Sequence, residues 1–334
     1  MLDRGGRVFN RSAPVIKLTH HDDEDIYLDV LGLLNSSSAC FWMKQVFHNK
    51  GSTVDQHGAR QRTMPFEDFY DIDGAKLKRF SLQIPQPINL AQQLDTLAQT
   101  LSALTAAALV RDAVPTAESL AVNQQRFALT RARMIALQEE LDWQCYGLYD
   151  LITEEDVAQV RCDNPPPLEL GQRAFEIVLA RRMAAGEEET TWFTRHGSMP
   201  ITQIPKAWPK DYQQVVQHRI DLIQNSKNIG LIERPEYKRR WNTEPWDKQQ
   251  EQALKNWLLD RLESYFDLDG RMNDQQTITA HALLVEPKLT SVARVADMAR
   301  ADQDFMQVAE IYQGRMDFDV ANLVGELIEA ESVP

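Results

Sequence analysis

The chain has 334 residues, with 36 Lys and Arg against 49 Asp and Glu, so its formal net charge at pH 7 is −13. Hydrophobic residues make up 43% and charged residues 25%, which excludes wholesale disorder and collagen-like structure. A chain of this length is expected to form roughly two or three folding units. It contains no run of about 18 uncharged apolar residues, so no membrane span is predicted, and it lacks a signal-peptide core near its start, which indicates a cytoplasmic protein.

Acidic residues are concentrated in two parts of the chain. The excess of Asp and Glu lies in residues 91–160 and 271–334, whereas residues 1–90 and 161–270 are nearly balanced. Salt limits the reach of an exposed charge to about 10 Å. The net charge therefore argues against a general nucleic-acid coat, but the balanced segments are still able to face a phosphate backbone. The three cysteines are widely spaced and fit neither a disulfide framework nor a zinc knuckle.

The first 88 residues mix short strand-like and helical patterns and predict a small α/β unit. Asn35–Ser38 are poor residues for a helix interior but good helix caps, so they predict a break between two helices. The expected elements are strands at 7–10, 14–18, 63–66 and 79–84, and helices at 26–34 and 39–47. Residues 48–63 contain two glycines and many polar side chains, and they predict a mobile polar loop.

A heptad pattern begins at residue 90. Apolar residues three and four positions apart form its seam, namely Leu90, Leu94, Leu97, Leu101, Leu104 and Ala108. After a break near Pro115, a second helix carries apolar residues every seven positions, namely Leu120, Phe127, Met134, Leu141 and Leu148. Two such helices joined by a short break predict an antiparallel hairpin that packs on a domain.

The rest of the chain reads as mainly helical. Apolar spacing predicts helices at 172–184, 209–225, 249–266, 291–300 and 305–312. The expected fold class is therefore α+β and mainly α. Its three expected parts are a small α/β domain at 1–88, an antiparallel helical hairpin that acts as a spacer at 89–150, and a mainly helical C-terminal region at 151–334.

One motif is similar to a catalytic motif of amino-methyltransferases. Asp163–Pro167 reads DNPPP. In those enzymes Asn-Pro-Pro is followed by an aromatic residue; the Asn side chain and the first proline carbonyl accept hydrogen bonds from the target amine, and the aromatic ring stacks on the flipped base. Here Pro167 takes the place of the ring, and no Gly-rich turn for a methyl donor precedes it. A proline-rich linker is the preferred interpretation.

Three other patterns have a metal or nuclease interpretation that the surrounding sequence does not favour. Glu236 and Lys238 have the spacing of a metal-dependent nuclease pair, but no strand pair surrounds them, and Lys238–Arg240 predicts an exposed basic turn. Neighbouring residues in His20–Asp23 point apart and predict a solvated turn. His48–Asn49 lacks the second histidine of a His-Asn-His nuclease. With no P-loop, nucleophile elbow or dinucleotide fingerprint either, no catalytic, cofactor-binding or metal-binding residue is predicted.

The segment 42–62 has the composition of a DNA-contacting element. Its basic residues are opposed by a single acid, Asp55. Arg and Lys hydrogen-bond guanine edges, Asn and Gln hydrogen-bond adenine edges, and Ser and Thr bind phosphate. The candidate DNA-binding residues are Lys44, His48, Asn49, Lys50, Ser52, Thr53, Gln56, Arg60, Gln61 and Arg62. A solvated surface loop without a partner is the alternative.

Several blocks of the sequence resemble known DNA-modifying proteins. Residues 79–87 read RFSLQIPQP and lead into the heptads; they resemble the exit from the target-recognition domain of restriction–modification specificity modules. Residues 31–51 read LGLLNSSSACFWMKQVFHNKG and resemble PglX-type adenine-specific DNA methyltransferases of phage-defence systems (BREX type 2, phage growth limitation). Further blocks resemble the same family in the same order, namely LQEELDWQCYGLY at 137–149, QRAFEIVLAR at 172–181 and IERPEYKRRWNTEPW at 232–246.

The resemblance, which covers residues 7 to 270, implies the C-terminal portion of a longer methyltransferase. In the family, the S-adenosylmethionine site and the Asn-Pro-Pro-aromatic motif precede the matched region, so no catalytic or cofactor residue carries over and this chain is expected to hold no cofactor. The resemblance implies that residues 1–88 form a target-recognition domain for double-stranded DNA, with other phage-defence components as further partners. A protein-interaction scaffold without direct DNA reading is the alternative that the net charge favours, and an autonomous hydrolase or nuclease is a third hypothesis.

Overall fold

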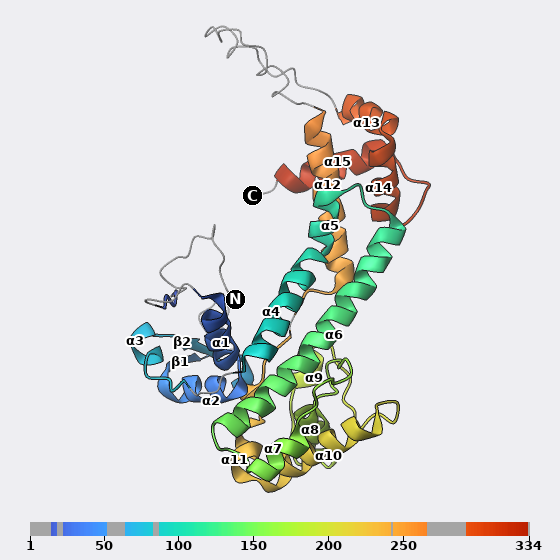
Figure 1. The fold of residues 1–334 in the computed structure, drawn as a ribbon. Helices are drawn as coiled ribbons and strands as arrows, with labels where there is room; N and C mark the ends of the chain where they lie inside the picture. The colour runs from blue at the N-terminus through green and yellow to red at the C-terminus, as the bar shows by residue number, and fades with distance from the viewer. Residues whose placement is uncertain are drawn as a thin grey trace. The chain divides into compact units, whose positions relative to one another are not determined.

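The computed structural model describes residues 15–18, 23–51, 64–82, 87–241, 243–265 and 292–332. Within these residues the protein has 15 α-helices and one two-stranded antiparallel sheet (Figure 1), which confirms a mainly α fold. The chain forms two compact units. The first unit contains residues 1–100 and 129–242, and the second contains residues 101–128 and 243–334. The division at residues 88 and 150 stays a prediction.

The helix, break and second helix expected near the start are confirmed. Helix α1 spans Glu24–Leu34 and α2 spans Ser37–Val46. Ser36 produces the break, because its hydroxyl donates to Leu33 O at 2.7 Å and accepts from Ala39 N at 3.2 Å. The Ser36 side chain thus forms hydrogen bonds with main-chain groups at the C-terminal end of α1 and at the N-terminal end of α2, as a helix cap does.

The strands lie elsewhere than the sequence pattern indicated. Strand β1, His48–Gly51, pairs antiparallel with β2, Phe69–Asp71, and the register shifts between Asn49 and Gly51. The strand expected at 63–66 is wrong, since Pro65–Glu67 form a 3-10 helix, η1, in which Pro65 contributes no amide donor. Residues 15–18 and 79–82 contain no strand, and helix α3 spans Gly74–Leu77. The strand expected at 7–10, and the remainder of those at 14–18 and 79–84, lie outside the described residues.

The continuous heptad helix is divided in two. Helix α4 spans Ile88–Ala103, α5 spans Ala106–Asp112, and α6 spans Ala117–Leu148 as expected. Thr105 separates α4 from α5 by accepting a hydrogen bond from Ala108 N, so it is an N-cap inside the predicted seam. Leu90 and Leu94 of α4 pack with Leu141 and Leu148 of α6, so the start of α4 lies beside the end of α6 in the predicted antiparallel sense (Figure 1).

The remaining helices of the first unit include one that is mostly buried. They are α7 (Glu154–Val160), α8 (Ala174–Ala184), α9 (Trp192–Arg195), α10 (Lys210–Asn225) and α11 (Lys227–Ile232), followed by the 3-10 helix η2 (Pro235–Tyr237). Seven consecutive residues of α8, from Ala174 to Ala180, are buried, and α10 packs against α7, α8 and α11. The helices predicted at 172–184 and 209–225 are confirmed as α8 and α10.

The second unit is a helical cluster with its own apolar core. Its further helices are α12 (Trp246–Ser264), α13 (Val292–Ala301), α14 (Gln303–Gln313) and α15 (Val320–Ser332). Leu254 and Leu258 of α12, Phe305 of α14 and Leu323 of α15 belong to one buried cluster. The helices predicted at 249–266, 291–300 and 305–312 correspond to α12, α13 and α14.

Candidate functional site

The predicted DNA-contacting segment begins at the end of α2 and continues through β1. Its described residues are Lys44, His48, Asn49 and Lys50. The other candidates lie outside the described residues, namely Ser52, Thr53, Gln56, Arg60, Gln61 and Arg62. The mobile loop expected from residue 48 is a strand up to Gly51.

Lys44 makes contacts within the protein. Its ammonium donates to the main-chain oxygen of Glu236 at 2.6 Å and lies 5.1 Å from the centre of the Tyr70 ring. Burial lowers the pKa of Lys44, the largest of several effects on this group. Lys44 therefore links α2 to η2 and β2, and the exposed side chains of β1 follow it.

Three consecutive side chains of β1 are exposed. His48 lies beside Asn49, whose amide donates to Asp68 at 2.8 Å. Lys50 pairs with Asp71 at 3.1 Å, and the two side chains are 55% and 62% exposed. An exposed pair of this kind is worth about 0–1 kcal/mol, so Lys50 is able to exchange Asp71 for a phosphate at little cost.

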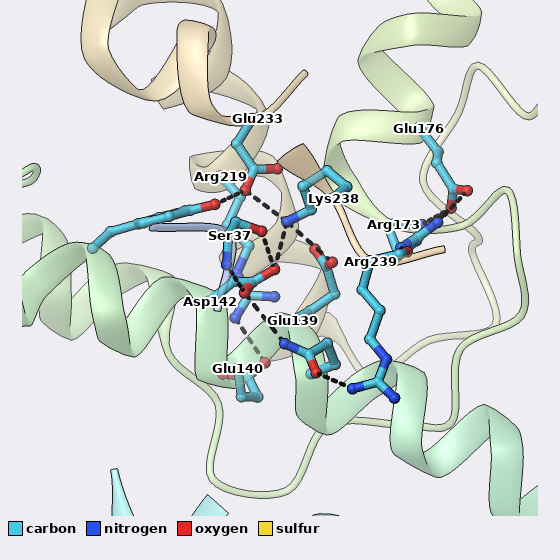
Figure 2. Close-up of polar contacts among 12 residues, drawn as sticks. Ser37, Glu139, Glu140, Asp142, Arg173, Glu176, Arg219, Glu233, Lys238 and Arg239 are labelled. Carbon is cyan, nitrogen blue, oxygen red and sulfur yellow. Dashed lines mark hydrogen bonds and ion pairs between the residues drawn. The ribbon is translucent and has the colours of Figure 1, made fainter. Parts of the chain in front are cut away.

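The first unit also contains a buried polar network, which the sequence analysis did not find (Figure 2). At its centre the ammonium of Lys238 lies 2.8 Å from Asp142, 2.8 Å from Glu233 and 3.3 Å from Glu139, and all four side chains are buried. Burial alone would lower the pKa of Lys238, but Asp142, Glu139 and Glu233 raise it well above its ordinary value. The exposed basic turn predicted at 238–240 is therefore wrong for Lys238, which the three carboxyl groups hold inside the protein.

The three carboxyl groups around Lys238 are held to different degrees. Asp142 accepts from the main-chain N of Ser37 at 2.8 Å and from the Ser37 hydroxyl at 2.7 Å, and Tyr146 donates its hydroxyl to Glu233. Glu139 lies within ion-pair distance of Lys238, but in the described part of the chain neither of its carboxyl oxygens has a hydrogen-bond partner. Burial raises the pKa of Glu139 to about 7, with Lys238 acting in the opposite direction. Glu139 is therefore the least well hydrogen-bonded of the three carboxyl groups.

Two further buried ion pairs flank this network. Arg173 lies 2.8 Å from Glu176, which also accepts from the Trp192 indole N–H at 3.0 Å. Arg219 lies 2.7 Å from Glu140. The signal in the sequence was Glu139–Asp142, which places three acids in a section of α6 whose neighbours are apolar. Acids buried in this way must be paired, although the sequence does not name the partners.

The Asn-Pro-Pro motif has a structural role. Arg133 of α6 donates one N–H to the Asn164 side-chain oxygen at 3.1 Å and another to the Pro165 main-chain oxygen. These are the two acceptors that a methyltransferase of this kind offers to its target amine. Arg133 thus links both acceptors of the motif to α6, and the interpretation of the motif as a linker stays a prediction.

The metal interpretations have no support in the described residues. Among them, no group of three or more His, Cys, Asp and Glu side chains is arranged to hold a metal ion. Asp23 caps α1, and the rest of the His20–Asp23 pattern lies outside the described residues. A search of the same residues for a helix able to cross a membrane finds none.

Comparisons with known proteins give a family. A family model described as a domain of unknown function, DUF7008, matches residues 134–334. The whole chain is 48% identical, over 337 aligned residues, to the adenine-specific methyltransferase PglX of Streptomyces coelicolor. The match covers 27% of that protein, so the chain spans about a quarter of the length of this relative. No solved structure matches the chain.

Proposed function

Because this chain belongs to the DUF7008 family and is similar over its whole length to part of an adenine-specific methyltransferase, we propose that it forms the DNA-recognising, C-terminal part of such an enzyme. The 48% identity to PglX carries the proposal. The methyl transfer from S-adenosylmethionine to adenine then takes place in another part of the enzyme, and a cytoplasmic location follows from the DNA substrate.

The proposed recognition element is β1 and the segment that follows it to residue 62. Three observations support this choice. His48, Asn49 and Lys50 are exposed next to one another, the segment 42–62 has a basic excess, and the ion pair of Lys50 with Asp71 is exposed. In this proposal residues 1–88 act as the target-recognition unit, and the hairpin of α4 and α6 acts as its spacer.

The buried network gives the recognition element a rigid base. Asp142 binds the first turn of α2 through Ser37, and Lys44 binds the other end of α2 to η2. A contact residue that is held in place loses less conformational entropy when it binds. Damage to the network is therefore expected to weaken DNA binding indirectly.

Duplex binding at two salt concentrations tests the proposal. Phosphate contacts predict an association constant that falls steeply as salt rises, with a slope of about −0.9 per phosphate in a double-logarithmic plot. Reversing the charge at Lys50, Arg60 and Arg62 is expected to abolish binding. Reversal at Lys210, an exposed residue at the start of α10, is the matched control. Absence of binding by the folded protein at low salt overturns the proposal.

A protein-interaction scaffold within a phage-defence complex is the second candidate, favoured by the net charge of −13. An acidic surface is repelled by the phosphates of DNA but attracts basic protein partners. The same variants distinguish the two functions. If the charge-reversed protein no longer binds its protein partner, a scaffold that is independent of the 42–62 segment is contradicted. If it still binds the partner and neither protein binds DNA, the scaffold function is favoured.

A further inference from the structure

An aromatic pocket of about 360 Å³ lies in the first unit, between α2, the segment after α3, the end of α6 and α11. Its walls include Phe41 and Trp42 of α2, Phe80, and Tyr149 just beyond α6. The volume lies within the range of about 300–1,000 Å³ that is typical of small-molecule sites.

The aromatic rings of the pocket support one another and leave surface uncovered. The ring centres of Trp42 and Phe80 are 5.2 Å apart in an edge-to-face arrangement, and those of Phe80 and Tyr149 are 6.0 Å apart. All of these rings are only partly buried. Aromatic pairs at such distances hold each other in place. The rings are therefore set for a flat ligand before it arrives.

A buried hydroxyl without a partner lines the same pocket. Ser38 of α2 is 8% exposed, and its hydroxyl oxygen has no hydrogen-bond partner among the described residues. Buried hydroxyl groups in proteins normally have a partner, and one left without a partner costs stability. Asn228 also lines the pocket and carries an amide that both donates and accepts hydrogen bonds. The lining thus combines polar side chains with aromatic surface.

One basic residue lines the pocket. Arg79 belongs to its lining and is exposed, as is Lys78, the preceding residue in the chain. Neither side chain is in an ion pair or a side-chain hydrogen bond among the described residues. A guanidinium group beside exposed aromatic rings is the combination with which proteins hold the phosphate and the base of an unstacked nucleotide. A purely apolar ligand would leave Arg79 and the Ser38 hydroxyl unused.

We propose that this pocket receives one unstacked nucleobase of the bound DNA. The base stacks against the rings of Trp42 and Phe80, its edge takes a hydrogen bond from or gives one to Ser38, and its phosphate lies against Arg79. This inference rests on the proposed function for the source of the nucleotide. It adds a specific feature, namely recognition of a base that has left the helix.

Two duplexes of the same sequence test the inference, one fully paired and one with a single bulged adenine. Stacking of one base on aromatic side chains is expected to tighten binding of the bulged duplex about tenfold. Ser38→Ala, which removes only a hydroxyl, and Arg79→Gln are expected to reduce the ratio of bulged-duplex to paired-duplex affinity. Ser198→Ala, a change of the same kind in another part of the first unit, is the matched control.

The outcomes separate the inference from the function on which it rests. If both duplexes bind equally and the pocket variants change nothing, the pocket inference is overturned and DNA recognition stands. If neither duplex binds, the proposed function fails, and titration with adenosine monophosphate then tests the pocket by itself. Binding of the nucleotide that is weakened in Trp42→Leu and Ser38→Ala supports the pocket inference. Absence of nucleotide binding overturns it. Thermal melting by circular dichroism shows that each variant is folded.

Discussion

The ammonium of Lys238 lies 2.8 Å from the carboxylate of Asp142, 96 residues earlier in the chain and near the C-terminal end of α6. Because Asp142 also accepts two hydrogen bonds from Ser37, this one contact joins η2, α6 and α2 in a single polar network (Figure 2). The network contains three carboxyl groups and one ammonium. The free energy of unfolding is therefore expected to change when one of these groups is replaced and when the pH changes.

Replacement of Lys238 by Met is expected to lower the free energy of unfolding by about 3–5 kcal/mol, since it leaves three buried carboxyl groups without a cation. Urea unfolding followed by tryptophan fluorescence measures the loss. Lys210→Met is the control, because Lys210 is exposed and its replacement is expected to change stability by less than about 0.5 kcal/mol. Equal losses in the two variants would show that the Lys238 network is not stabilising.

The network predicts a pH dependence that originates at Glu139. The pKa of its carboxyl group rises from 4.5 to about 7 on folding, chiefly because of burial. Between these values the folded state binds more protons than the unfolded state, so this contribution to stability is complete below pH 4.5 and is lost as the pH rises through about 7. Urea unfolding at several pH values from 5 to 8 measures the decline.

Glu139→Gln is the control for that pH series. The amide keeps the size of the neutral carboxyl group but does not titrate. The variant is therefore expected to lose the decline between pH 5 and 8 that the unaltered protein shows. A decline of the same size in both proteins would assign it to another group.

Gly171 is expected to tolerate no side chain. Its φ is +94°, and a Cβ atom there would lie 2.3 Å from the main-chain oxygen of Met199. Gly171→Ala therefore combines backbone strain with a clash, and we expect a loss of about 2–4 kcal/mol in unfolding free energy. At Gly186, φ is +73° and the space is open. Gly186→Ala thus measures backbone strain alone, and a loss as large as that of Gly171→Ala would contradict the proposed clash.

Asp302 is expected to stabilise the second unit. It caps α14 by accepting from the main-chain N of Phe305, and it pairs with Arg261 at 2.6 Å. Asp302→Ala should cost about 1–2 kcal/mol, most of it from the cap, because the Arg261 side chain is 38% exposed and solvent screens the pair. Differential scanning calorimetry measures the loss, and Asp304→Ala, at a more exposed carboxyl in the same turn, is the control.

The carboxyl group of Asp302 also makes stability depend on pH in the acid range. Hydrogen bonding from Arg261, the largest of several effects, lowers the pKa of Asp302 to about 2 from 3.8. Its contribution is therefore present above pH 3.8 and is lost as the pH falls through about 2. In Asp302→Ala this part of the acid destabilisation is expected to disappear.

The local elements could be predicted from the sequence wherever one residue or one periodic pattern decides them. Ser36 divides α1 from α2 through bonds to its immediate neighbours, and heptad spacing gave the length of α6 because a helix repeats its face every seven residues. The break at Thr105 was missed for a related reason. A cap inside an otherwise regular seam gives a weak signal, and the seam leucines on both sides continue the same period.

The strands and the polar network depend on contacts that local patterns do not contain. Strand β1 is polar and pairs with β2 across 18–23 residues of chain, so alternation of apolar and polar residues could not reveal it. The local sequence predicts that Lys238 belongs to an exposed basic turn. It does not show that Asp142, Glu139 and Glu233 lie around the Lys238 ammonium.

The sequence by itself determined the mainly helical fold, the positions of the longest helices and the family of the protein. These follow from short-range periodicity and from blocks of residues in a fixed order, both of which can be recognised in the sequence. The tertiary structure alone decided which charged groups are buried and which aromatic rings share a pocket. Phe41, Phe80 and Tyr149 line one pocket only because α2, the segment after α3 and the end of α6 pack together. Packing between distant segments is set by the whole unit and not by any one of them.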